Sequence, residues 1–395
     1  MRHNSFSCHT YKITLPQTLC LPHIRDPRGV GNVMVNHPSR TGSTSAAWLQ
    51  MDPFCVPFSR YTFFQTSETA ERFLVTEACR PEKPPLLYWN LNLSPRTVTK
   101  LRISIVQYLN TAPLVWGFTN GLLRGKYDLS FTVPSQCAEQ LRTGNADVAI
   151  IPAIEYQRID DLVILPDMAI ASKRQVRSLL IIAKIPIEQA KSFALDRSSR
   201  STQTLTRILC AEKWKIAPAF FEAPPDLGAM LQQADAALLI GDPALRIALG
   251  IEKDSWPGTE GRTVCQAATL GIAGPEFLYV YDVVGEWRSL TGLPAVLAVW
   301  AARQDIATPD VAADFLASRD FGLSHMPEIS FDAAPKLELP QPALESYLRH
   351  NIDFSLDVEN RRGLELYFAH AAKLGLIPRA KPLEWAATKA EAVKL

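Results

Sequence analysis

The residues of this chain best suited to chemistry form the hydroxyl-rich segment 196–202, which reads DRSSRST. It follows an apolar run typical of a strand, and apolar residues recur at helical spacing after it. The free N–H groups at a helix start bind anions, and hydroxyl side chains there cap the helix or add further donors. Capping needs one hydroxyl, whereas this segment has four, together with Arg200. It therefore favours a carboxylate site, with plain capping as the alternative; the candidate binding residues are Ser198, Ser199, Arg200, Ser201 and Thr202.

Further polar residues lie at the ends of predicted strands, where open α/β sheets place their ligands. Asn110 ends the apolar stretch LRISIVQYLN, Ser135 follows the next predicted strand, and Ser178 opens a later one. The structural alternatives are a turn for Asn110 and a backbone hydrogen bond for Ser178. No GxSxG motif surrounds Ser178, and residues 101–324 contain no histidine, so a hydrolase triad is disfavoured.

Two carboxylates are candidates for contacting a substrate or accepting a proton, since the predicted cleft has no histidine. Glu155 lies just after an apolar run, and Asp242 follows Gly241 where a strand meets a loop. Gly-Asp-Pro is also ordinary turn chemistry, so capping of the next helix is the alternative for Asp242.

The sequence predicts neither a cofactor nor a metal. No GxGxxG or GxxxxGK[ST] phosphate loop occurs, and the seven cysteines form no CxxC pair. The spacings of the N-terminal histidines and cysteines match no usual zinc pattern. Scattered cysteines, odd in number, are typical of free thiols in a reducing cytoplasm.

Composition narrows the classes of partner. The net charge is +1, which gives no sign of a nucleic acid or membrane-surface partner. No apolar run reaches the roughly 18 residues of a membrane span, and the N-terminus lacks the apolar core of a secretion signal. We therefore expect a cytoplasmic protein with a small-molecule ligand. The sequence leaves the oligomeric state open, a homodimer included.

The pattern of predicted secondary structure changes near residue 100. Residues 1–98 are rich in proline and show no βα alternation, which predicts a poorly ordered N-terminal extension. From residue 101 onward, short connections between strands and helices indicate an α/β fold. Strands are expected at 102–106, 128–132, 147–151, 162–166, 177–183, 192–196, 218–222, 236–240, 277–282 and 295–301. Helices are expected at 111–123, 134–143, 201–214, 226–233, 306–318, 341–350 and 358–374.

A series of ordered motifs between residue 101 and residue 378 resembles the menaquinone-pathway chorismate dehydratases. The motifs are VQYLNTAPL from Val106, VPS from Val133, DVAIIP from Asp147, VRSLL from Val176, LDRSSRST from Leu195, AALLIGDPAL from Ala236 and WRSLTGLP from Trp287.

The resemblance implies a two-lobed α/β fold like that of type II periplasmic binding proteins, with a central cleft between the lobes. The first lobe would be discontinuous, 99–185 plus 292–390, and the second would span 186–291. The family's catalytic asparagine and serine correspond to Asn110 and Ser178, and its carboxylate-binding segment corresponds to the SSRST run.

The activity that the resemblance implies is loss of water from chorismate to give 3-[(1-carboxyvinyl)oxy]benzoate, on the futalosine route to menaquinone. Chorismate has two carboxylates, and hydroxyl groups and helix N-termini are suitable hydrogen-bond donors to them. With no histidine in the cleft, we expect the enolpyruvyl carboxylate of the substrate to take the C3 proton. The competing mechanism uses Glu155 or Asp242 as the base.

Three rival functions share the expected fold. The first is an anion-binding protein without catalysis. The second is the later, dihydroxynaphthoate-forming enzyme of the same pathway, whose family uses a cleft histidine that residues 101–324 lack. The third, prephenate dehydratase, would carry a regulatory domain after the lobes.

Overall fold

The computed structural model describes residues 32–38, 44–50, 100–251 and 262–388. The chain divides into two units, Met1–Asn92 and Leu93–Leu395. In the first unit, β1 (Asn32–Pro38) pairs antiparallel with β2 (Thr44–Gln50). This hairpin is the described part of the extension predicted over 1–98, and the remainder of that prediction lies outside the described residues.

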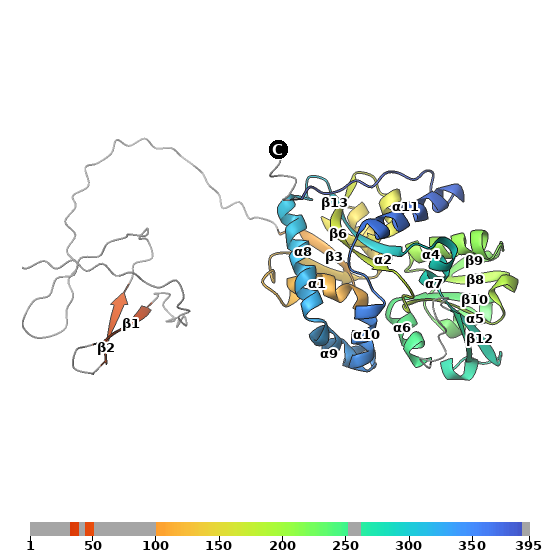
Figure 1. Ribbon diagram of the computed structural model, residues 1–395, viewed down its shortest axis with the longest axis horizontal. Coiled ribbons are helices and arrows are strands. Elements are labelled where there is room, and N and C mark those ends of the chain that lie inside the picture. The colour runs from red at the N-terminus through yellow and green to blue at the C-terminus, as the bar shows by residue number, and fades with distance from the viewer. Residues whose placement is uncertain (1–31, 39–43, 51–99, 252–261, 389–395) are drawn as a thin grey trace, which may run out of the picture. The chain divides into compact units, whose positions relative to one another are not determined.

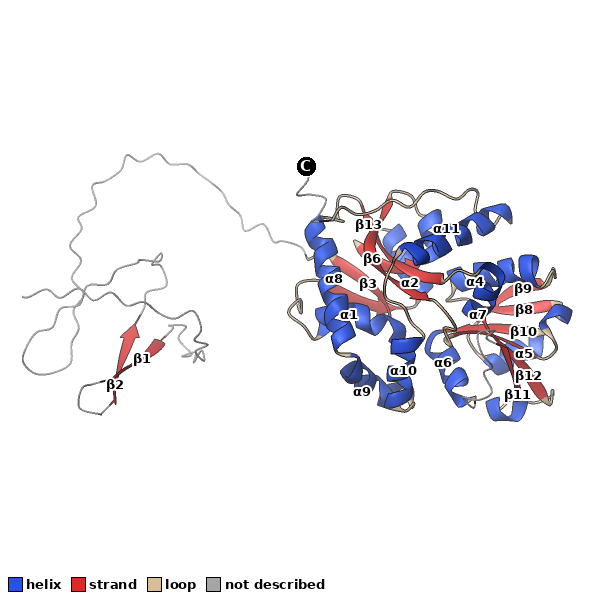
Figure 2. Cartoon of the chain, viewed as in Figure 1, coloured by secondary structure: helices blue, strands red, loops and turns tan. Residues whose placement is uncertain are grey.

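The first sheet of the second unit has five strands in the order β4-β3-β5-β13-β6 (Figures 1 and 2). β3 pairs in parallel with β4 and β5, whereas β13 runs antiparallel to β5 and β6. The strands are β3 (Arg102–Val106), β4 (Asp128–Thr132), β5 (Val148–Pro152), β6 (Leu162–Ser172) and β13 (Ala295–Arg303).

The second sheet has six strands in the order β11-β12-β7-β10-β8-β9. β10, β8 and β9 are parallel, and β7, β12 and β11 are antiparallel to their neighbours. The strands are β7 (Leu179–Ala183), β8 (Ser192–Asp196), β9 (Ala219–Ala223), β10 (Ala236–Ile240), β11 (Arg262–Gln266) and β12 (Phe277–Asp282).

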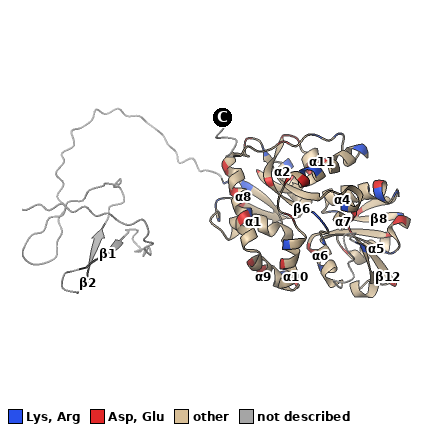
Figure 3. Cartoon of the chain, viewed as in Figure 1, with Lys and Arg blue, Asp and Glu red and all other residues tan. Residues whose placement is uncertain are grey.

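Helices pack on both sheets (Figure 2). Figure 3 shows that residues of both charge signs occur along the chain's helices, in keeping with the small net charge. The α-helices are α1 (Ala112–Thr119), α2 (Pro134–Arg142), α3 (Ala153–Arg158), α4 (Arg200–Ile208), α5 (Leu227–Gln233), α6 (Gly241–Gly250), α7 (Val283–Thr291), α8 (Pro309–Ser324), α9 (Met326–Leu337), α10 (Gln341–His350) and α11 (Val358–Lys373). Shorter helical turns are η1 (Leu109–Thr111), η2 (Ile187–Gln189), the π-helical η3 (Leu209–Lys213) and η5 (Ala267–Leu270). Among the described residues, none of the helices has the length and apolar character that crossing a membrane requires.

The two sheets form two lobes, which confirms the predicted α/β class. The chain passes from the first sheet to the second between β6 and β7 and returns between α7 and β13. One predicted boundary is wrong. The first lobe was expected to extend to residue 185, but β7 pairs with β10 and β12 of the second sheet. Strand pairing, which chain order does not reveal, assigns β7 to the second lobe.

Sequence reasoning found all the strands of the second unit except β11, and it missed four helices. Two of these, α3 and α6, start directly at the ends of β5 and β10 without a separating loop. α9 contains Pro335 in its last turn, and a proline normally argues against a helix interior. The fourth is α7, whose start is capped by Asp282.

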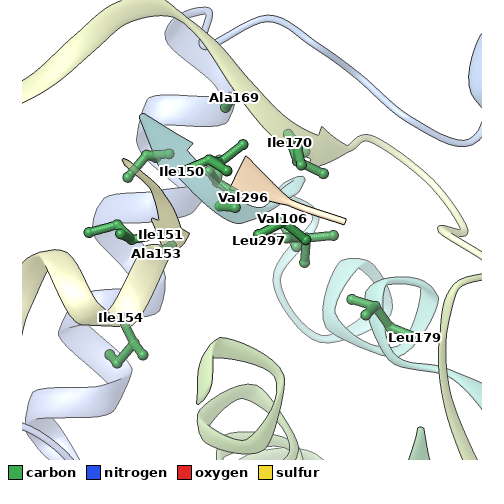
Figure 4. Close-up of a cluster of buried hydrophobic side chains, with 14 of the residues drawn as sticks. Val106, Ile150, Ile151, Ala153, Ile154, Ala169, Ile170, Leu179, Val296 and Leu297 are labelled. Atoms are coloured by element: carbon green, nitrogen blue, oxygen red, sulfur yellow. The ribbon is translucent and has the colours of Figure 1, made fainter. Parts of the chain in front are cut away.

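Buried aliphatic residues join the first sheet to the cleft between the lobes. Figure 4 shows a cluster of buried side chains that includes Ile150 and Ile151 of β5, Val296 and Leu297 of β13, and Leu179 of β7. Burying such side chains stabilises the fold by about 1.5–3 kcal/mol each. The apolar base of the cleft is therefore an extension of the core.

Close packing of α1 against α8 yields the first prediction. A Cβ atom at Gly322 would lie 1.9 Å from the carbonyl oxygen of Pro113. Overpacking of this kind costs about 1–3 kcal/mol or more, so Gly322→Ala should lower the free energy of unfolding by at least that amount. Gly250→Ala is the matched control, because a Cβ there meets nothing within 4 Å. It should change stability by less than about 0.5 kcal/mol. Equal effects in urea unfolding would contradict this account of the packing.

Candidate active site

A cleft of about 450 Å³, part of it open to solvent, lies between the two lobes. The lining residues come from both sheets and from the starts of three helices. They are Val106, Tyr108, Asn110, Pro134, Pro152, Ile170, Leu179, Ser199, Arg200, Ser201, Thr202, Ile240, Gly241, Leu297 and Ala298.

The start of α4 forms the polar wall of the cleft. Ser199 is the residue before the first turn of the helix, yet its side chain makes no capping hydrogen bond. Ser199, Ser201 and Thr202 are nearly buried and line the cleft. Simple capping therefore does not account for these hydroxyls. A helix start leaves its first N–H groups for water or a ligand, and its dipole favours an anion there.

A buried aspartate shapes the turn that leads into this wall. Asp196 accepts hydrogen bonds from the Ser198 N–H at 2.9 Å and the Ser198 Oγ at 2.6 Å. Burial raises the pKa of Asp196, and the bonds from Ser198 oppose that rise. Ser198 is thus engaged in the turn, and its side chain is not part of the cleft lining.

Ser201 and Ser135 connect the two lobes. The Ile154 N–H at the start of α3 donates to Ser201 Oγ at 3.1 Å, which leaves the Ser201 hydrogen available for another acceptor. The Ser135 N–H donates to the Ser198 carbonyl at 3.2 Å. At the start of α2, Pro134 lines the cleft and Ser135 does not.

Glu155 lies behind the polar wall in a cluster of three arginines. Its fully buried carboxylate contacts Arg142 Nη2 at 2.5 Å, Arg158 Nη1 at 3.0 Å and Arg200 Nη1 at 3.0 Å. Burial alone would raise the pKa of Glu155, but the guanidinium groups outweigh burial and lower it. Glu155 is not part of the cleft lining, whereas Arg200 is. The carboxylate therefore holds Arg200 in place and is a poor proton acceptor.

Asn110 lies in η1 at the end of β3, where the sequence placed it, and it lines the cleft. The preceding residue fixes this turn, because the Leu109 N–H donates to Asp242 Oδ1 at 3.1 Å. Burial raises the pKa of Asp242 to about 6, in spite of that hydrogen bond. Asp242 is near the reaction space without being part of the cleft lining.

Ser178 lies directly behind the lining residue Leu179 and is almost fully buried. The segment before it is tightly held, since the N–H groups of Val176 and Arg177 donate to Asp282. Arg177 adopts φ 62°, a region that non-glycine residues rarely occupy. The Gly241 N–H donates to the Ser178 carbonyl at 2.8 Å. Backbone constraints therefore define the position of Ser178.

Sequence reasoning missed three residues of the site. Tyr108 and Gly241 both lie in motifs quoted for the resemblance, and both line the cleft. Gly241 has φ 67°, and a Cβ there would lie 2.6 Å from the Tyr108 ring, so the contact requires glycine. The third is Tyr347 of α10, whose hydroxyl donates to Ser178 Oγ at 2.9 Å. No local pattern indicates that a helix so distant in sequence reaches Ser178.

Within the ranges that the structure describes, no group of three or more histidine, cysteine, aspartate or glutamate side chains could hold a metal ion. The cleft instead combines hydroxyls, a helix start, an arginine and an asparagine amide over an apolar base. This arrangement suits a small organic anion with an apolar ring.

The fold is that of a two-lobed α/β protein like the type II periplasmic binding proteins, and hydroxyls and an arginine line the cleft between the lobes. The family model described as "Menaquinone biosynthesis" matches residues 101–373, and the chain belongs to this family.

The chain is also similar to individual proteins and solved structures. The chain is 26% identical over 283 residues to a protein of Thermus thermophilus named chorismate dehydratase, covering 71% of this chain and 98% of that protein. An Archaeoglobus fulgidus crystal structure shares the fold with a TM-score of 0.54 and 18% identity, covering 70% of this chain and 98% of its own. The aliphatic sulphonate binding protein of Escherichia coli matches with a TM-score of 0.46 and 17% identity, over 73% and 94% of the two chains.

The Glu155 cluster yields the second prediction. Glu155→Gln removes the charge that compensates three arginines, so the folded state should lose stability at pH 7. Breaking a buried ion pair costs about 3–5 kcal/mol. Because the guanidinium groups are about one-third exposed, we expect about 1–3 kcal/mol. Glu139→Gln, which removes a more exposed partner of Arg142, should cost less than about 1 kcal/mol.

The pH dependence of this loss has a definite sign. Folding lowers the pKa of Glu155, so its stabilising contribution is present above its unfolded pKa of about 4.3 and disappears as pH falls through the lower folded value. The stability difference between wild type and Glu155→Gln should therefore shrink below about pH 4. A difference that is constant from pH 7 to pH 3 in urea unfolding would contradict the proposed ion pairing.

Proposed function

We propose that this chain is a carbon–oxygen lyase that removes water from chorismate to give 3-[(1-carboxyvinyl)oxy]benzoate, on the futalosine route to menaquinone. Membership of the menaquinone family and the relative named chorismate dehydratase support this proposal. A biosynthetic relative also favours a cytoplasmic location. The observation that carries the proposal is the start of α4, whose hydroxyls and Arg200 line the same cleft as Asn110 while Ser199 makes no capping hydrogen bond.

The polar wall provides the groups that a dicarboxylate needs. One carboxylate of chorismate would accept hydrogen bonds from the first turn of α4 and from the Ser199 and Thr202 hydroxyls. Ser201 would add its free hydrogen, because its oxygen already accepts from Ile154. Charge-assisted hydrogen bonds of this kind contribute about 1.5–3 kcal/mol each.

The ring of the substrate would lie on the apolar base formed by Val106, Ile170, Leu179 and Leu297. Orienting the ring aligns the C3 hydrogen and the C4 hydroxyl for elimination. Asn110 would then place its amide beside the reacting atoms, where a fixed donor stabilises developing negative charge.

The proton acceptor that we propose is the enolpyruvyl carboxylate of the substrate. The C3–H electron pair forms the new ring double bond and the C4–O bond breaks. The departing hydroxide becomes water by taking up the proton that the substrate carboxylate has accepted from C3, so the elimination balances. Glu155 is disfavoured as the base because three arginines engage it and its pKa is lowered. Asp242, with its pKa raised to about 6, is the remaining protein alternative.

Incubation of the purified chain with chorismate tests the function directly. The expected product lacks one molecule of water, contains an aromatic ring and forms without added metal or nucleotide; ultraviolet absorbance and mass spectrometry detect it. Tight binding of chorismate without product would instead identify a binding protein and overturn the proposal.

The third prediction concerns the polar wall. Thr202→Val keeps the size of the side chain and removes its hydroxyl, so KM for chorismate should rise roughly 10- to 100-fold with little change in melting temperature. Thr204→Val is the matched control, because the Thr204 hydroxyl bonds to the Arg200 carbonyl within the helix. Ser201→Ala should weaken binding and also lower stability, since it deprives the Ile154 N–H of its acceptor. An unchanged KM for Thr202→Val would show that this hydroxyl does not contact substrate.

The fourth prediction distinguishes the two proton acceptors. Asn110→Ala should lower kcat about 10²- to 10³-fold, as expected when a positioned donor is removed. Asp242→Asn should have a small effect, because an asparagine oxygen can still accept from the Leu109 N–H. Turnover measured for both variants with saturating chorismate decides the matter. Abolished turnover in Asp242→Asn together with near-normal turnover in Asn110→Ala would assign the base to Asp242.

A further inference from the structure

Tyr347 is a buried polar residue that the cleft lining does not include. It belongs to α10, where Leu344, Tyr347 and Leu348 form the buried face at helical spacing. The Tyr347 side chain is 2% exposed. Its hydroxyl donates to Ser178 Oγ at 2.9 Å, and the nearby Asn110 side chain acts to lower the pKa of Tyr347. Tyr347 thus contacts Ser178 and lies near Asn110, the two residues expected to act in catalysis.

The direction of this hydrogen bond limits what Ser178 can do. A tyrosine hydroxyl has one hydrogen, and a serine hydroxyl has one hydrogen and two lone pairs. Because Tyr347 gives its hydrogen to Ser178 Oγ, the Ser178 hydrogen must point to another acceptor. Burial raises the pKa of Tyr347, although hydrogen bonding to Ser178 favours the ionised form. Tyr347 therefore stays protonated and remains a donor.

A separate contact holds α10 in place independently of the tyrosine. The Asn351 Nδ2 group, just after the helix, donates to the Gln175 carbonyl at 2.8 Å. This bond fastens the end of α10 to the crossover segment that also carries Ser178. The hydroxyl of Tyr347 is accordingly not needed to attach the helix.

We propose that Tyr347 is a positioning residue for the reaction, which orients the Ser178 hydroxyl so that its hydrogen points toward Asn110 and the substrate. Oriented in this way, Ser178 donates to the charge that develops on the departing C4 oxygen. The inference rests on the proposed dehydration of chorismate and extends it to a residue outside the cleft.

The test is a double-mutant cycle on kcat. Tyr347→Phe keeps the ring and removes only the hydroxyl, so kcat should fall about tenfold, equivalent to about 1.4 kcal/mol, while KM changes less than about threefold. In the Ser178→Ala background the same change should have an effect below about twofold, because the oriented hydroxyl is already absent. Asn351→Ala is the matched control and should lower the melting temperature without lowering kcat.

Stability provides the second measurement. Ser178→Ala leaves the buried Tyr347 hydroxyl without its acceptor and should lower the melting temperature. Adding Tyr347→Phe should restore it, because removing both partners of a buried bond is nearly neutral.

The outcomes separate the inference from the function on which it rests. Wild-type turnover with an unchanged kcat in Tyr347→Phe would overturn the inference alone. Equal losses of kcat in both backgrounds, or failure of Tyr347→Phe to fold, would show a structural role and overturn it as well. Absence of wild-type turnover would overturn the proposed function and the inference with it.

Discussion

The arrangement of the cleft depends on buried carboxylates, since a charge removed from water must be compensated by opposite charge or by hydrogen bonds. Glu155 is the clearest case. It is inaccessible to solvent, and three guanidinium groups from α2, α3 and α4 surround it. One of them, Arg200, belongs to the second lobe and lines the cleft. Compensating this single charge therefore joins the lobes and places a cation at the polar wall.

Other carboxylates arrange the remaining walls in the same way. Asp196 forms the turn before α4, and Asp282 accepts from four backbone N–H groups around Ser178 and the start of α7. Asp242 fixes the turn that carries Asn110. These acidic groups thus position backbone, while hydroxyls, an amide and an arginine face the ligand space. Such a division suits a reaction in which the substrate supplies its own base.

Strong local signals pointed to several of the residues that line the cleft, Asn110 and the segment 199–202 among them. Their roles in binding and catalysis stay predictions. Asn110 lies in the turn after β3. The hydroxyls of 198–202 follow β8 of the second lobe, where α4 begins. The role of Glu155 could not be predicted, because its partners come from three helices that only the fold brings together. Tyr347 was missed for the same reason. The lobe boundary was misplaced since the pairing of β7 depends on distant strands.

The most direct test of the central claim is the pH dependence of kcat for the wild-type chain with chorismate deuterated at C3. If the substrate carboxylate takes the C3 proton, the dehydrated product forms with a primary isotope effect. The value of kcat then shows no inflection near the Asp242 pKa of about 6. If kcat instead falls as pH falls through that value, and Asp242→Asn has no turnover at any pH, the account is contradicted and Asp242 is the base.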